Sequence, residues 1–202
     1  WQCSDKEFEK FCEIFPYNEF LDKMSILPDN PIRKKAFKVF SCCATSDFFP
    51  SEQYSTDMDV LSFFYSFLDS PISDEVSSAL QILACIMLEC PQVCEFLVET
   101  QKLHAKLSLI EATPQFAKIL AILSDVHPES LELTIPLIPY CLQTHNSQTI
   151  SFSLLAMISA LKNEPESAPI IISLVDEYAT NLLSFDVYNI EESDTQYPDE
   201  IV

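Results

Sequence analysis

The chain has 202 residues, of which 48% are hydrophobic and 21% charged, a composition typical of globular rather than disordered chains. Its net charge of −20, from 31 acidic and 11 basic side chains, opposes direct nucleic-acid binding and attraction to an anionic membrane surface. Glycine is absent, so glycine-rich phosphate loops, dinucleotide turns and nucleophile elbows cannot exist in their usual form, and tight β-hairpins are disfavoured.

The N-terminal part predicts short amphipathic helices, followed by a first strongly apolar helix. The apolar positions that define the short helices are Phe8, Phe11, Cys12, Phe15, Phe20 and Leu21. The next segment contains "AFKVFSCC", residues 36–43, and the one basic cluster, "PIRKK", precedes it at residues 31–35. We interpret this cluster as the solvated first turn of a helix, with a weak localisation signal as the alternative.

The apolar segment at residues 36–43 recurs along the chain. Similar segments stand at 79–86 ("ALQILACI"), 116–123 ("FAKILAIL") and 151–158 ("SFSLLAMI"), at a spacing near 40 residues. Each copy is followed by a proline, at Pro50, Pro91, Pro128 and Pro165. A period of this length indicates a repeat architecture in which each proline opens the next helix.

The second copy shows why the segments would stack. Val76, Leu80, Leu83 and Met87 follow the helical spacing of one face, and Ala79, Ile82 and Ile86 form a second apolar face. Only a narrow stripe, Ser78, Gln81 and Cys85, is left to face water. A helix that is apolar on two faces must lie between neighbours on both.

Shorter helices are predicted between the repeat cores. Residues 92–111 indicate two helices broken near Thr100 and Gln101, and residues 129–145 carry Pro136 and Pro139, which predict a short or kinked helix. Residues 166–185 predict one longer helix or two abutting ones.

Residues 67–103, "FLDSPISDEVSSALQILACIMLECPQVCEFLVETQKL", resemble an armadillo repeat. The matching positions, in order, are Leu68, Ser70, Pro71, Glu75, Val76, Ala79, Leu83, Ile86, Pro91, Glu99 and Leu103, whereas Gln101 stands where the family usually has glycine. The resemblance extends loosely over residues 18–185, with HEAT repeats as a neighbouring alternative. It implies an all-α fold, a right-handed α-solenoid of about four armadillo/HEAT-like helical repeats over residues 1–185.

The resemblance also implies a groove along the third helix of each repeat. Armadillo proteins that clamp basic peptides carry Trp and, four residues on, Asn on this helix, and no such pair is present here. We therefore expect no import-receptor role. The predicted partner-binding groove consists of Lys35, Lys38, Cys42, Gln81, Cys85, Lys118, Ile122, Ser153 and Met157. These residues suit an amphipathic helix or an acidic-apolar segment better than a basic peptide.

Residues 186–202 form an acidic C-terminal tail without a basic residue. Its acidic residues include Glu191, Glu192, Asp194, Asp199 and Glu200. The tail could dock on the chain itself or on a neighbouring molecule. The excess negative charge of the whole chain is interpreted as a solvated surface, with a patch for a basic partner as the alternative.

The eight cysteines show no paired framework, and most lie in apolar helical runs where a thiol acts as a small hydrophobe. No signal peptide and no apolar run of about 18 residues is evident. We expect a cytoplasmic protein without membrane insertion, with the nucleus as the alternative. Since Trp1 is not an initiator Met, we expect the chain to begin inside a longer protein.

No arrangement of side chains predicts catalysis, a metal site or a cofactor. Cys90 and Cys94 lack a second metal-ligating pair, Cys141 and His145 lack an orienting acid, and acidic residues such as Asp74 are typical of a helix start. The sequence therefore predicts a non-catalytic scaffold that binds a helical or extended segment of another protein. The alternative is a structural subunit of a large cytoskeletal, ciliary or trafficking assembly.

Overall fold

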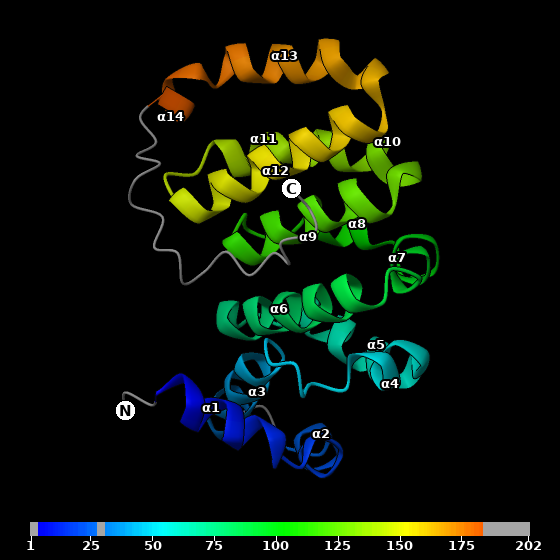
Figure 1. Cartoon of the computed structure of the whole chain (residues 1–202), viewed down its shortest axis with the longest axis vertical. Coiled ribbons are helices and arrows are strands. Elements are labelled where there is room, and N and C mark those ends of the chain that lie inside the picture. Colours follow the sequence, from blue (N-terminus) through cyan, green and yellow to red (C-terminus); the bar gives the residue numbers. More distant parts are fainter. Residues whose placement is uncertain (1–3, 28–30, 184–202) are drawn as a thin grey trace. The chain divides into compact units, whose positions relative to one another are not determined.

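The computed structural model describes residues 4–27 and 31–183, and within these ranges the secondary structure is helical, without a strand (Figure 1). The all-α prediction is confirmed. The chain divides into two compact units, Trp1–Glu111 and Ala112–Val202. The predicted acidic tail, residues 186–202, lies outside the described residues.

The first unit contains the helices that carry the first two repeat cores. They are α1 (Asp5–Glu13), α2 (Tyr17–Ser25), α3 (Pro31–Cys43), α4 (Ser51–Thr56), α5 (Met58–Ser66), the 3-10 turn η1 (Phe67–Asp69), α6 (Ser73–Glu89), α7 (Val93–Glu95), the π-helical turn η2 (Phe96–Thr100) and α8 (Leu103–Leu107). Two of these helices have clear caps. Ser4 and Glu7 form a capping box at α1, and Asp57 accepts two backbone N–H bonds at the start of α5.

Aromatic rings form the core beneath α3. The Phe40 ring centroid lies 5.7 Å from those of Phe49 and Phe64, and the Phe37 and Phe67 centroids are 4.3 Å apart with tilted rings. These contacts join α3 to α5 and η1, so the buried side of α3 is fixed by large, rigid side chains.

Helix α6 is buried on both of its predicted apolar faces except at Val76, near its start, which is half-exposed. Leu80, Ile82, Leu83, Ile86 and Met87 have no exposed surface, as the repeat pattern predicts. The stripe expected to face water differs from the prediction, because Ser78 and Cys85 are buried and only Gln81 is half-exposed. A small hydroxyl or thiol fits a packed surface, so polarity alone did not identify the open side of this helix.

The break predicted near Thr100 and Gln101 is confirmed, and Lys102 makes the turn. Lys102 has φ 56° and ψ 47°, the left-handed conformation that glycine adopts most easily. In a chain without glycine, a lysine therefore occupies the strained position one residue after the site where the armadillo pattern places glycine.

The second unit contains the other two repeat cores. Its elements are α9 (Pro114–Val126), η3 (Pro128–Ser130), α10 (Leu131–Thr134), η4 (Ile135–Leu137), α11 (Ile138–Leu142), α12 (Ser147–Asn163), η5 (Pro165–Ser167), α13 (Ala168–Glu177) and α14 (Ala179–Leu183). Pro136 and Pro139 lie where the helix is broken into short pieces, and Tyr178 separates α13 from α14. Both predictions for these segments are confirmed.

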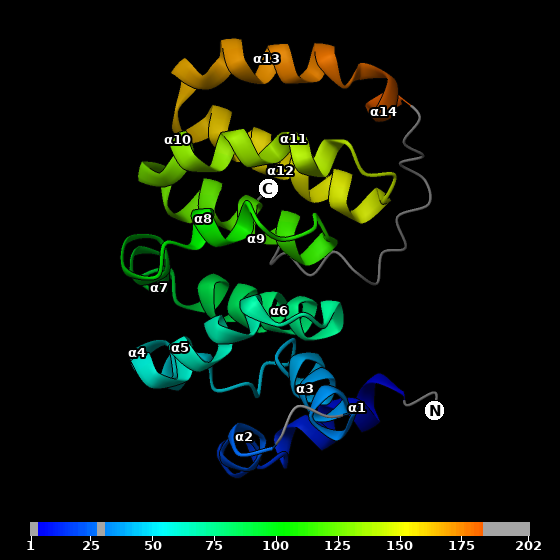
Figure 2. The same ribbon diagram turned by 180° about the vertical axis from the view of Figure 1, so that it is seen from behind.

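Helices α9 and α12 form the main packing of the second unit and lie side by side in both views (Figures 1 and 2). Thr113 and Asn146 cap their N-termini through bonds from the backbone N–H of Phe116 and Thr149. At the other end, the Asn163 side chain donates to the Ser124 carbonyl at 2.9 Å. Caps and this cross-helix bond fix the register of the pair.

Candidate functional site

The exposed side of α3 combines lysines with apolar side chains. Lys35, Lys38 and Cys42, three residues of the predicted groove, are all exposed. Beside them lie Ile32 and Val39, which are 67% and 42% exposed. Residues at these spacings share one helix face, so the two rows run next to each other along α3. We call these five residues the α3 face.

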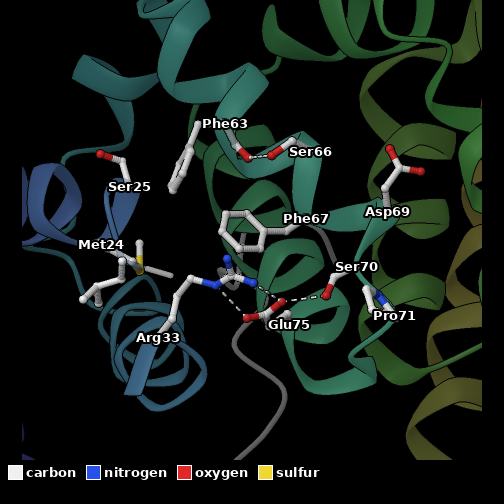
Figure 3. A pocket seen from close by; sticks show the side chains of 11 residues that line it. Met24, Ser25, Arg33, Phe63, Ser66, Phe67, Asp69, Ser70, Pro71 and Glu75 are labelled. Carbon is white, nitrogen blue, oxygen red and sulfur yellow. Dashed lines mark hydrogen bonds and ion pairs between the residues drawn. The ribbon is translucent and has the colours of Figure 1, made fainter. Parts of the chain in front are cut away.

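An ion-pair cluster anchors α3 to α6 beside this face (Figure 3). Arg33 donates from Nε and Nη2 to the two carboxylate oxygens of Glu75, at 3.1 and 3.2 Å. Ser70 Oγ donates to Glu75 Oε2 at 2.6 Å and accepts the Ile72 N–H at 3.1 Å. Glu75 has no exposed surface, so its charge is balanced almost entirely by these donors.

The guanidinium of Arg33 also lies over the Phe67 ring, 5.5 Å from its centroid. Its neighbour Lys34 forms a second bridge from α3 to α6, with Nζ 2.5 Å from Asp74 Oδ2. The Lys34 hydrogen bond and charge, together with the charge of Lys38, lower the pKa of Asp74. Two of the four basic residues of α3 are thus engaged with α6.

A cavity of about 310 Å³ lies next to this cluster, lined by residues of the α2–α3, η1 and α6 regions. Met24 and Phe63 contribute apolar walls, and Arg33 and Glu75 a polar one (Figure 3). Asp69 and the hydroxyls of Ser66 and Ser70 also line the cavity, so its wall is polar as well as apolar.

The remaining residues of the predicted groove are less accessible. Gln81 is half-buried and donates to Cys85 Sγ at 3.4 Å, and Lys118 on α9 is half-buried. Cys85, Ile122, Ser153 and Met157 are buried, at 8%, 1%, 0% and 3% exposure. The Ser153 hydroxyl donates to the Thr149 carbonyl of its own helix. Of the nine groove residues, those on α3 present the most surface.

A second exposed region lies on α12 and α13, which pack against each other in the second unit. On α12, Leu155, Ile158 and Leu161 are 37%, 60% and 37% exposed, and their spacing places them on one face. On α13, Ile170 and Ile172 are 54% and 61% exposed. We call the α12 residues the α12 stripe; sequence reasoning did not single them out.

The buried thiols do not have the character of nucleophiles. Burial raises the pKa of Cys43, Cys94 and Cys141 to about 12. The sequence offers Cys141 and His145 as a candidate nucleophile and base, but the raised pKa of the Cys141 thiol disfavours the thiolate that a nucleophile requires. His145 itself is exposed.

Across residues 4–27 and 31–183, no group of three His, Cys, Asp or Glu side chains is placed to hold a metal ion. None of the helices in this described part combines the length and apolarity needed to cross a membrane. Comparison with protein-family models, curated proteins and solved structures finds no match.

The Arg33–Glu75 pair was missed by sequence reasoning, which assigned the acids at positions 74 and 75 to the helix start alone. Both acids do lie in the first turn of α6. The signal that could have found the pair is the spacing of the apolar segments. The two residues are 42 positions apart, close to the spacing between the segments at residues 36–43 and 79–86.

Proposed function

We propose that the chain is a non-catalytic protein-interaction scaffold, built as a right-handed α-solenoid of armadillo/HEAT-like repeats. The four repeat cores fall within the four long helices α3, α6, α9 and α12. Shorter helices separate these four, as such an architecture requires.

The observation that carries the repeat proposal is the sequence separation between residues joined by long-range side-chain hydrogen bonds. Ten such bonds among the described residues join residues 34 to 42 positions apart, which is about one repeat. Tyr54 bonds to Asn18, Tyr65 to the Gln101 carbonyl, Lys106 to Asp69, and Gln143 to Tyr178. Contacts limited to adjacent units are the defining property of a repeat array.

The scaffold role is supported by exposed apolar side chains on long helices. Ile32 of the α3 face and Ile158 of the α12 stripe are exposed, whereas α6 buries most large apolar side chains of its two faces. Apolar surface on an ordered helix is the usual feature of a protein-binding site. The raised thiol pKa values at Cys94 and Cys141 are consistent with a structural rather than a reactive use of cysteine.

This proposal is tested by capturing partners on the immobilised full chain and then measuring binding of each purified candidate by titration. We expect saturable binding of one protein, retained by a single peptide segment of that protein. A chain that binds no purified candidate saturably, or that turns over a substrate, would contradict the scaffold role. We expect the partners in the cytoplasm or nucleus, in line with the cysteine usage.

The second candidate function is a structural subunit of a larger assembly. It is favoured by the exposed Ile158, Ile170 and Ile172, which lie on two packed helices of the second unit. Light scattering over a range of concentrations separates the two functions. A scaffold should stay monomeric, whereas a subunit with an open apolar surface should associate, and Ile158→Glu should reverse that association.

A further inference from the structure

The α3 face has a charge character opposite to that of the chain around it. Residues 31–46 contain no Asp or Glu but carry four basic side chains, in a chain with a net charge of −20. Arg33 and Lys34 are paired with Glu75 and Asp74. Among the described residues no ion pair of Lys35 or Lys38 is present, so these two carry the positive charge that remains available.

The apolar row of the face gives it a second recognition element. Ile32 and Val39 are seven residues apart on α3, which corresponds to about 10 Å along the helix. A helix laid against α3 presents apolar side chains at the same interval. In sequence, Lys35 lies between Ile32 and Val39. On the surface of the helix it belongs to the adjacent row, with Lys38.

We propose that the α3 face binds one amphipathic helix of a partner protein, with an apolar stripe on Ile32 and Val39 and an acidic edge on Lys35 and Lys38. This inference rests on the proposed scaffold function and names the partner chemistry of one site. Charge complementarity selects the occupant, because an acidic edge gains attraction from both lysines. A second copy of the chain is disfavoured, since two α3 faces would bring lysines against lysines.

The test uses three synthetic peptides and the full chain, followed by fluorescence anisotropy. The first peptide is a 21-residue amphipathic helix with a leucine stripe and glutamate edges. The second has lysine edges, and the third has the residues of the first in scrambled order. We expect the glutamate helix to bind about tenfold more tightly than the scrambled peptide, and binding to weaken as salt is raised.

The variant Lys35→Glu/Lys38→Glu should weaken binding of the glutamate helix by about tenfold or more, and Ile32→Ser/Val39→Ser by a similar factor. The matched control is Lys10→Glu/Lys23→Glu, two exposed lysines of α1 and α2, which should leave the affinity within about twofold. Circular dichroism and thermal melts of each variant verify that the exposed substitutions leave the fold intact.

Equal effects of the two lysine double variants would overturn the proposal, because attraction would then come from overall charge. Failure of the glutamate helix to bind would overturn it too, while saturable binding of a captured partner would leave the scaffold function standing. A peptide of residues 184–202 is the last probe. If it binds through Lys35 and Lys38 and the glutamate helix does not, the chain's own C-terminal segment is the occupant and the proposal is wrong.

Discussion

Helices α6 and α12 are both 17 residues long and both contain one of the similar apolar segments, yet they are covered differently. Helix α6 buries Leu80, Leu83 and Ile82 from two sides, whereas α12 buries one face and leaves Ile158 60% exposed. Similar apolar content therefore serves two purposes. In α6 it stabilises the fold, and in α12 it forms a surface that is available for association.

The largest expected effect comes from truncating an apolar side chain in each helix. Leu83→Ala should lower the free energy of unfolding by about 3 kcal/mol, because a side chain without exposed surface leaves a cavity. Ile158→Ala in α12 should cost less than about 0.5 kcal/mol. Urea unfolding followed by circular dichroism measures both. Equal losses would show that the two helices are covered alike.

Breaking the ion pair at α6 should likewise lower the free energy of unfolding more than breaking the ion pair at α12. Glu75→Gln in α6 weakens the bidentate partner of Arg33 and should cost about 1–3 kcal/mol, since a largely buried guanidinium then loses a charged hydrogen-bond partner. Lys162→Gln at α12 breaks a 3.8 Å surface pair with Asp125 and should cost less than about 0.5 kcal/mol. Replacing the first pair together, as Arg33→Met/Glu75→Leu, should recover much of the loss. No recovery would mean that Glu75 acts through other contacts.

Two breaks between helices farther along each unit, at Lys102 between η2 and α8 and at Tyr178 between α13 and α14, provide a smaller test. Lys102→Gly should stabilise the chain by about 0.5–1 kcal/mol, because glycine removes the left-handed strain at φ 56°. The corresponding break after α12, at Tyr178, has φ −102°, so Tyr178→Gly should destabilise by about 1 kcal/mol. Thermal melts compare the two. A destabilising Lys102→Gly would indicate that the lysine side chain stabilises the turn.

One effect is common to both regions, depends on pH and is absent at neutral pH. The pKa values of Cys94, after α6, and Cys141, before α12, are raised to about 12 by burial, from an ordinary value of 9.0. The folded chain therefore holds these protons more tightly than the unfolded chain does. The contribution of these two thiols to the free energy of unfolding is fully present below pH 9.0 and is lost as the pH rises toward 12. Melting temperatures should decline above pH 9.0, and Cys94→Ala/Cys141→Ala should make that decline shallower.

Much of the fold follows from sequence because it depends on spacing and prolines. The period near 40 residues located the four long helices, Pro136 and Pro139 located the broken segment, and Thr100 and Gln101 located a turn. These signals act through the local backbone, where proline lacks an N–H and apolar side chains recur every three or four residues.

The candidate site was less predictable from sequence, because the exposure of a side chain depends on which element packs against its helix. Lys35 and Lys38 were expected at the surface and are exposed, whereas Ser78 and Cys85 were expected there and are buried. A lysine must keep its charge in water, but a serine hydroxyl can bond to its own helix and a thiol is nearly apolar. The open side of α12 could not be found, since an exposed leucine and a buried one are identical in sequence.

The moderate sequence separation of the side-chain hydrogen bonds affects how the chain folds. Bridges of 34 to 42 residues close loops of nearly equal and moderate length, so no single closure dominates the entropic barrier. Chains whose contacts join residues at moderate sequence separation fold quickly for their size. Their segments can also open one after another instead of all together. Amide hydrogen exchange should therefore resolve several opening events, with α13 exchanging before α6.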